Sequence, residues 1–155
     1  MTRQQAAAPP SAQKIQSRQV RLRRASLAIL IALIVQFALG IGVNLYVTLP
    51  TAGRPGHSSW FGNGALLALH AALGMFLILA AIALLVRAIM AGNVTLIATS
   101  AAGLAAIVLA FFFGATFAEK LTDGYSLGMA IAFAVALACY AIGLYALTAR
   151  RGGPS

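Results

Sequence analysis

Four uninterrupted apolar blocks constrain the fold of this chain more than any other feature of its sequence. A helix needs about 20 consecutive apolar residues to cross a bilayer, and it satisfies all of its own backbone hydrogen bonds there. A membrane β-barrel would instead need shorter segments in which apolar and polar residues alternate. We therefore predict an all-α integral membrane protein, a four-helix bundle that runs up-down-up-down. The predicted spans are approximately 25–47, 65–86, 94–117 and 126–148.

The composition leaves room for one membrane domain and little else. Only 8% of the 155 residues are charged and the mean hydropathy is +0.93, whereas a soluble domain carries about 25% charged residues. The four spans belong to a single domain over residues 14–151, with no space for a soluble catalytic module. The polar, proline-containing residues 1–13 predict a disordered tail, and residues 152–155 form a second, short one.

The net charge of +9 is distributed unevenly along the chain. Nine of the eleven basic residues fall before the first span, between the second and third, or after the fourth. Cytoplasmic loops carry such an excess of arginine and lysine, so both termini are predicted to be cytoplasmic in a multi-pass protein. The nine residues are Arg3, Lys14, Arg18, Arg21, Arg23, Arg24, Arg87, Arg150 and Arg151.

The basic stretch 14–24 predicts contact with anionic lipid headgroups. No aromatic residue is interleaved with its arginines, as a single-strand nucleic-acid platform would need, so no nucleic acid is expected. A composition rich in alanine and glycine, with arginine preferred to lysine, indicates a GC-rich bacterial genome and hence the plasma membrane. A homodimer or a larger membrane complex is left open.

The segment "ALLALHAALGMFLIL" places His70 in an apolar run with no other ionisable group. Polar groups inside a span usually face the bundle interior and raise a functional hypothesis. Gln36, Gly40 and Asn44 share one broad face of the first span, and Asn44 is expected at about the depth of His70. A neutral imidazole can ligate heme iron or another metal, hydrogen-bond a quinone carbonyl or relay a proton.

Several other activities are disfavoured. A structural zinc site needs four ligands, and hydrolysis needs a nucleophile, a base and an orienting acid within reach. No span is broken by proline and none contains an acid, which disfavours a proton-coupled transporter. Cys139 is the chain's one cysteine, so no intrachain disulfide can form. A heme b site needs fewer protein groups than a zinc or hydrolase site, namely one or two axial ligands and an apolar slot. The ligand candidates for zinc are His57, His70, Glu119, Asp123 and Cys139.

The segment "QFALGIGVNLYVTLP", followed after a loop by "LHAALGMFLILAAIALLVRA", resembles one four-helix half of the heme A synthase family over residues 30–88. In that family a histidine near the outer end of a helix ligates heme, and the resemblance implies that His70 is an axial ligand. Compact four-helix relatives of the fold that would work as dimers are known, and the resemblance carries nothing over beyond His70. The resembling positions are Gln36, Leu39, Gly40, Pro50 and His70.

This chain departs from the family beside the histidine. The family's catalytic half carries an acid before its histidine and an arginine after it, where this chain has Leu67 and Ala71. The resemblance therefore implies heme binding without oxidation of heme. The second axial ligand would be Met129, His57 or a residue of a second subunit.

Two hypotheses follow from these residues. In the first, the chain is a small membrane protein that binds heme b or quinone through His70, with Gln36 and Asn44 lining the pocket. In the second, it is a non-catalytic membrane subunit or scaffold without a cofactor, in which these polar groups only hydrogen-bond across helices. Such bonds are worth about 0.6–2 kcal/mol each.

Overall fold

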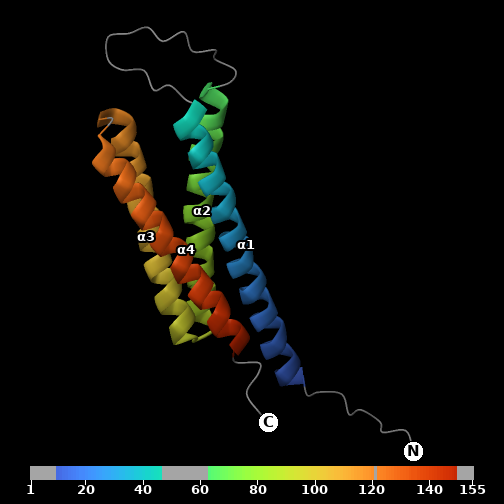
Figure 1. The fold of residues 1–155 in the computed structure, drawn as a ribbon. Coiled ribbons are helices and arrows are strands. Elements are labelled where there is room, and N and C mark those ends of the chain that lie inside the picture. The colour runs from blue at the N-terminus through green and yellow to red at the C-terminus, as the bar shows by residue number, and fades with distance from the viewer. Residues whose placement is uncertain (1–9, 47–62, 121, 150–155) are drawn as a thin grey trace, which may run out of the picture.

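The structure is a computed structural model that describes residues 10–46, 63–120 and 122–149. All four elements in these ranges are α-helices, which confirms the predicted all-α class (Figure 1). Each helix contains a window long and apolar enough to cross a membrane. The helices are α1 (Pro10–Tyr46), α2 (Asn63–Met90), α3 (Val94–Lys120) and α4 (Asp123–Ala149).

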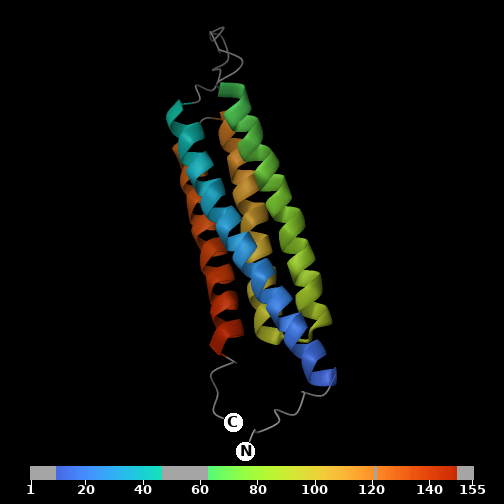
Figure 2. The ribbon, with the colours of Figure 1, turned by 90° about the vertical axis from the view of Figure 1, so that its right-hand side faces the viewer.

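Consecutive helices run in opposite directions, and each described helix packs against two neighbours (Figure 2). α1 contacts α2 and α4, and α3 contacts the same two helices. The chain is therefore two antiparallel hairpins, α1–α2 and α3–α4, arranged as a four-membered ring. The packing is most extensive between α3 and α4.

The two ends of the bundle differ in charge. One end carries the start of α1, the α2–α3 turn and the end of α4, and we call it the arginine end because Arg18, Arg21, Arg24 and Arg87 lie there. The opposite end carries Glu119 and Asp123, which are the only two acidic residues of the chain, and we call it the acidic end.

The turn between α2 and α3 is specified by two residues. Gly92 adopts a positive φ of 64°, which glycine tolerates without strain. Its N–H donates to the Ile89 carbonyl at 3.0 Å and the N–H of Asn93 donates to the Ala88 carbonyl at 3.4 Å, which is the Schellman pattern that ends a helix. Asn93 then caps α3, since its Oδ1 accepts from the Leu96 N–H at 3.2 Å.

The helices extend beyond the predicted spans, because a helix does not have to stop where the hydrocarbon ends. The largest difference is at α1, which begins at Pro10. The prediction of a disordered tail over 1–13 is therefore wrong for residues 10–13, where proline suits the first turn of a helix. Residues 1–9 and 152–155, also predicted as tails, lie outside the described residues.

The buried core is confined to the half of the bundle next to the arginine end, which we call the arginine half. Buried positions recur every three or four residues on each helix, the spacing of a four-helix bundle interior. They run over Leu22–Leu33 on α1, Leu77–Ala88 on α2, Leu96–Ile107 on α3 and Ala132–Leu147 on α4.

In the remaining half, next to the acidic end, no described residue is buried. The inward-facing stripe continues there at the same spacing, but its residues are only half-buried. The two hairpins diverge toward this end (Figure 1), and Phe37 of α1 stacks on Phe133 of α4 with ring centroids 5.6 Å apart near the point of divergence. We call this part the acidic half. Its half-buried stripe includes Gln36, Gly40, His70, Gly74, Gly114 and Met129.

Three buried hydroxyl groups interrupt the apolar core of the arginine half. Ser26 and Ser100 are each 1% exposed and Tyr140 is 2% exposed, and none of their hydroxyl oxygens has a hydrogen-bond partner among the described residues. Thr99 and Thr148, in contrast, donate to carbonyls of their own helices. The ring of Tyr140 is held by packing on Gly103 rather than by its hydroxyl.

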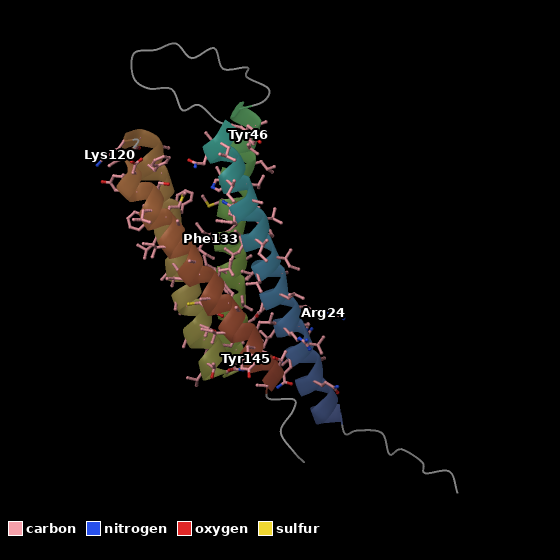
Figure 3. The ribbon with its side chains drawn as sticks, in the orientation of Figure 1. Arg24, Tyr46, Lys120, Phe133 and Tyr145 are labelled. Atoms are coloured by element: carbon pink, nitrogen blue, oxygen red, sulfur yellow. The ribbon has the colours of Figure 1, made fainter. Side chains whose placement is uncertain are left out.

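Large apolar side chains cover the outside of the bundle (Figure 3). Leu79 is 61% exposed, Phe112 63% and Leu127 63%. An exposed apolar surface of this extent would aggregate in water but suits lipid tails. Four membrane-spanning helices in a lipid bilayer therefore account for both the inside and the outside of the fold.

The close approach of α3 and α4 predicts that Gly103→Ala destabilises the bundle. A Cβ at position 103 would lie 2.7 Å from Cε2 of Tyr140 and 2.9 Å from its Cζ, so the buried ring has to shift. We expect the free energy of unfolding to fall by about 1–3 kcal/mol, measured by SDS titration in mixed micelles. The control is Gly64→Ala, since that position meets open space; equal losses in both variants would contradict the prediction.

The unpartnered hydroxyls give a second prediction. A buried polar group without a partner opposes folding, so Tyr140→Phe and Ser100→Ala should leave stability unchanged or raise it by up to about 2 kcal/mol. The same SDS titration measures this. A loss of more than about 1 kcal/mol in either variant would mean that the hydroxyl is hydrogen-bonded in the membrane.

Candidate functional site

Gln36 and His70 form a direct polar contact between α1 and α2 in the acidic half. Nε2 of Gln36 donates to the backbone carbonyl of His70 at 3.0 Å and lies 3.3 Å from Nε2 of the imidazole. Both residues occupy the inward stripe of their helices and are half-buried. One amide thus bridges the backbone and the side chain of the same histidine.

The hydrogen-bond pattern fixes the roles of the atoms. Only the amide nitrogen of Gln36 can donate to a carbonyl, which sets the orientation of the amide. The amide nitrogen then also donates to Nε2 of His70, which must accept. An accepting Nε2 belongs to a neutral imidazole whose proton is on Nδ1.

Two glycines make room for this contact. A Cβ on Gly40 would lie 3.2 Å from Cε1 of His70, and a Cβ on Gly74 would lie 3.2 Å from Nε2 of Gln36. Each glycine sits one helical turn from the polar residue on its own helix, so the two helices approach closely at both levels. The imidazole of His70 lies against the α1 backbone where a larger residue than glycine would stand.

Each polar residue keeps one unused hydrogen-bonding atom. Nδ1 of His70 and Oε1 of Gln36 are buried and have no partner among the described residues. By the assignment above, Nδ1–H is an unused donor and Oε1 an unused acceptor. A buried polar group without a hydrogen-bond partner costs free energy. A ligand or a water molecule that hydrogen-bonds to this donor and this acceptor would remove that cost.

The other predicted site residues lie apart from this contact. Asn44 is exposed, one turn beyond Gly40, and its depth is not that of His70. Sδ of Met129 lies 3.1 Å from where a Cβ of Gly114 would be, inside the α3–α4 hairpin. His57 lies outside the described residues.

Met129 nevertheless lies at about the level of His70. Phe37 of α1 stacks on Phe133 of α4, and Gly40 contacts His70 three residues further along α1. Because α1 and α4 are antiparallel, the residue at the level of Gly40 lies three or four residues before Phe133, at Met129. α2 and α4 are not neighbours in the ring, so His70 and Met129 lie on opposite hairpins at this level.

Metal ligands are sparse in the part of the chain that the structure describes. No three His, Cys, Asp or Glu side chains come together there. Cys139 is partly buried in the arginine half, on α4, far from His70. A metal held by His70 would therefore need ligands of another kind, such as a porphyrin and a thioether.

Comparisons with known protein families, with curated proteins and with solved structures find no match for this chain. The site is therefore interpreted from its own residues.

Sequence reasoning identified Gln36 and His70 but missed the role of Gly74. The signal was present, since 70 and 74 share a face of α2 as 36 and 40 share a face of α1. The buried hydroxyls of Ser26, Ser100 and Tyr140 were also missed. Serine and tyrosine within an apolar span do not reveal from sequence whether they face the axis or the lipid.

The contact predicts energetic coupling between Gln36 and His70. In a double-mutant cycle with Gln36→Leu and His70→Leu, we expect a coupling energy of about 0.6–2 kcal/mol in SDS titrations. A cycle of His70→Leu with Asn44→Leu is the control and should show no coupling, because Asn44 is exposed beyond the contact. Additive losses for Gln36 and His70 would show that the contact is absent in the membrane.

Proposed function

We propose that this chain is a multi-pass membrane protein that binds the ring of a lipid-soluble quinone in its acidic half, through His70 and Gln36. The observation that carries the proposal is the unused pair of atoms, Nδ1–H of His70 and Oε1 of Gln36. A quinone carbonyl accepts a hydrogen bond from the former, and the hydroxyl of the reduced quinol donates one to the latter. Both oxidation states of the ring therefore have a partner.

The divergence of the hairpins supports access from the membrane. The core is packed in the arginine half and only half-buried around Gln36 and His70. A hydrophobic ligand would reach these half-buried residues from the lipid, without crossing water. The half-buried Ala110 and Phe133 of the other hairpin would provide apolar surface for its ring.

Part of the existing contact survives quinone binding. For Nδ1 to meet a carbonyl, the imidazole has to turn away from Gly40, which gives up the 3.3 Å contact between its Nε2 and the amide nitrogen of Gln36. The hydrogen bond from that nitrogen to the backbone carbonyl of His70 does not depend on the ring, so it still joins α1 to α2. The new hydrogen bond from Nδ1, which has no partner among the described residues, offsets the lost contact.

Heme b is the second candidate, and one observation favours it: His70 and Met129 lie at one level on opposite hairpins. A histidine and a methionine can serve as axial ligands of heme iron, and His70 is the ligand that the resemblance to the heme A synthase family implies. The donor atoms fit less well as they stand. The lone pair of Nε2 accepts from Gln36, Nδ1 carries the proton, and the sulfur of Met129 is packed on Gly114.

We further propose that the arginine end faces the cytoplasm, as its excess of basic residues favours. The quinone site then lies in the outer half of a bacterial plasma membrane, and the basic start of α1 lies at anionic headgroups. A scaffold without a cofactor, in which Gln36 and His70 only join α1 to α2, is the competing function. A homodimer or larger complex would fit either function.

The test is quinone retention by purified protein. Wild type, His70→Leu and Asn44→Leu are purified in mild detergent, incubated with ubiquinone-2, passed over a desalting column and extracted for chromatography. We expect near-stoichiometric quinone in wild type and in Asn44→Leu, and an affinity about tenfold lower in His70→Leu, as one lost hydrogen bond of about 1.4 kcal/mol would give.

The same samples separate the competing functions. A reduced-minus-oxidised absorption spectrum of b type in wild type, lost in His70→Leu, would replace quinone by heme. If the protein retains no quinone and shows no heme spectrum after quinone and heme have both been supplied, the proposal is overturned and the scaffold function remains. Quinone bound equally by wild type and His70→Leu would place the ligand elsewhere.

A further inference from the structure

The arginine end carries a cavity of about 520 Å³ between the start of α1 and the end of α2. Four of its eight lining residues are arginines, three of them from α1 and one from α2. These four arginines therefore come from two helices that are brought together only by the fold. The lining residues are Arg18, Arg21, Leu22, Arg24, Ala25, Arg87, Met90 and Ala91.

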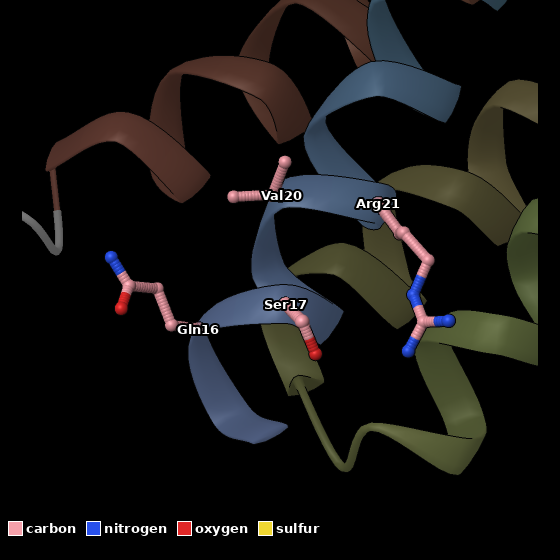
Figure 4. A pocket seen from close by; sticks show the side chains of 4 residues that line it. All are labelled: Gln16, Ser17, Val20 and Arg21. Carbon is pink, nitrogen blue, oxygen red and sulfur yellow. The ribbon is translucent and has the colours of Figure 1, made fainter. Parts of the chain in front are cut away.

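This cluster has no neutralising acid. The chain has two acidic residues, Glu119 and Asp123, and both lie at the opposite end of the bundle. α3 has 27 residues and so spans about 40 Å, which is several Debye lengths at physiological ionic strength. Arg21 also lines an adjoining hollow with Gln16, Ser17 and Val20, on the face of α1 that Figure 4 shows. The positive charge at this end must be balanced from outside the chain.

Apolar residues line the cavity beside the arginines. Leu22 is buried beneath it, whereas Met90 is 74% exposed at its edge. The same two helices expose Leu27 of α1 and Val86 and Ile89 of α2, which are 44%, 49% and 57% exposed. The arginines supply charged donors, and the exposed apolar residues supply a surface along the helices. This combination fits an amphiphile whose phosphate lies at the arginines and whose acyl chains lie along the helices.

From this arrangement we infer a binding site for one anionic phospholipid at the arginine end, with its phosphate held by Arg18, Arg21, Arg24 and Arg87. Guanidinium groups bind phosphate through paired hydrogen bonds, which lysine cannot supply in the same geometry. Free phosphate has the same head chemistry but would leave the apolar surface beside Met90 unused. The site rests on the proposed membrane placement of this end but not on any ligand at His70.

Arg87 distinguishes a built site from diffuse attraction. A basic N-terminal stretch at a membrane surface attracts anionic lipid through its total charge, whichever arginine carries it. Arg23 belongs to that stretch and is exposed, but it does not line the cavity. Arg87→Gln and Arg23→Gln therefore remove the same charge at the same end, and only the first removes a cavity residue.

The experiment is native mass spectrometry of wild type, Arg87→Gln and Arg23→Gln, titrated with phosphatidylglycerol, with phosphatidylcholine or with inorganic phosphate. We expect one tightly bound phosphatidylglycerol on wild type and little retention of the other two. Arg87→Gln should weaken that binding about fivefold, the equivalent of about 1 kcal/mol for one arginine at the surface. Arg23→Gln should change it by less than about twofold, because Arg23 does not line the cavity and acts only through screened, longer-range attraction.

Three results would overturn the site. Equal weakening by both substitutions would mean that the attraction is diffuse. Equal binding of phosphatidylcholine would mean that the charge is not recognised, and saturation by inorganic phosphate would mean that the acyl chains play no part. Circular dichroism and the SDS titration check that both variants fold, and the quinone assay is read separately, so failure of one proposal does not decide the other.

Discussion

Lipid tails are as apolar as leucine, so burial of apolar surface does not hold these helices together in a membrane. Association has to come from close packing and from hydrogen bonds between helices, and the structure shows both at small residues. Gly103 lets the ring of Tyr140 lie on the backbone of α3, and Gly40 and Gly74 let His70 and Gln36 meet. Each hairpin is joined where a glycine removes the Cβ that would separate its helices.

The two halves of the bundle use this constraint differently. In the arginine half all four helices contribute to one buried core, and packing there fixes the arrangement of the hairpins. In the acidic half each hairpin remains packed within itself, by Gln36 on His70 and by Gly114 under Met129, while the hairpins diverge. The bundle therefore has a fully packed base and a half-buried part where the hairpins separate. The candidate site and the buried core lie in different halves of the same four helices.

Much of the fold could be predicted from sequence, because about 20 apolar residues in a row leave the backbone no alternative to a helix in lipid. The register between helices could not. Asn44 was expected at the depth of His70, yet Gly40 lies there and Asn44 is exposed one turn further on. Each span is apolar on all of its faces, so the sequence pattern does not reveal which face points toward the bundle axis. The start of α1 at Pro10 was missed for a related reason, since hydropathy marks where lipid ends and not where hydrogen bonding ends.

The atoms of the Gln36–His70 contact decide which ligands are compatible with it. Four hydrogen-bonding atoms are involved. The amide nitrogen of Gln36 and Nε2 of His70 join α1 to α2, whereas Oε1 of Gln36 and Nδ1–H of His70 have no partner among the described residues. A ligand that hydrogen-bonds can use the second pair once the imidazole turns, and the bond from the amide nitrogen to the backbone carbonyl of His70 still joins the two helices. A metal needs a nitrogen lone pair, and the only one on this ring is already accepting from Gln36. Iron at His70 would take the lone pair that accepts from Gln36 and would leave Nδ1–H and Oε1 without partners. The proposed quinone would use those two atoms, and this difference supports the proposal of quinone over heme.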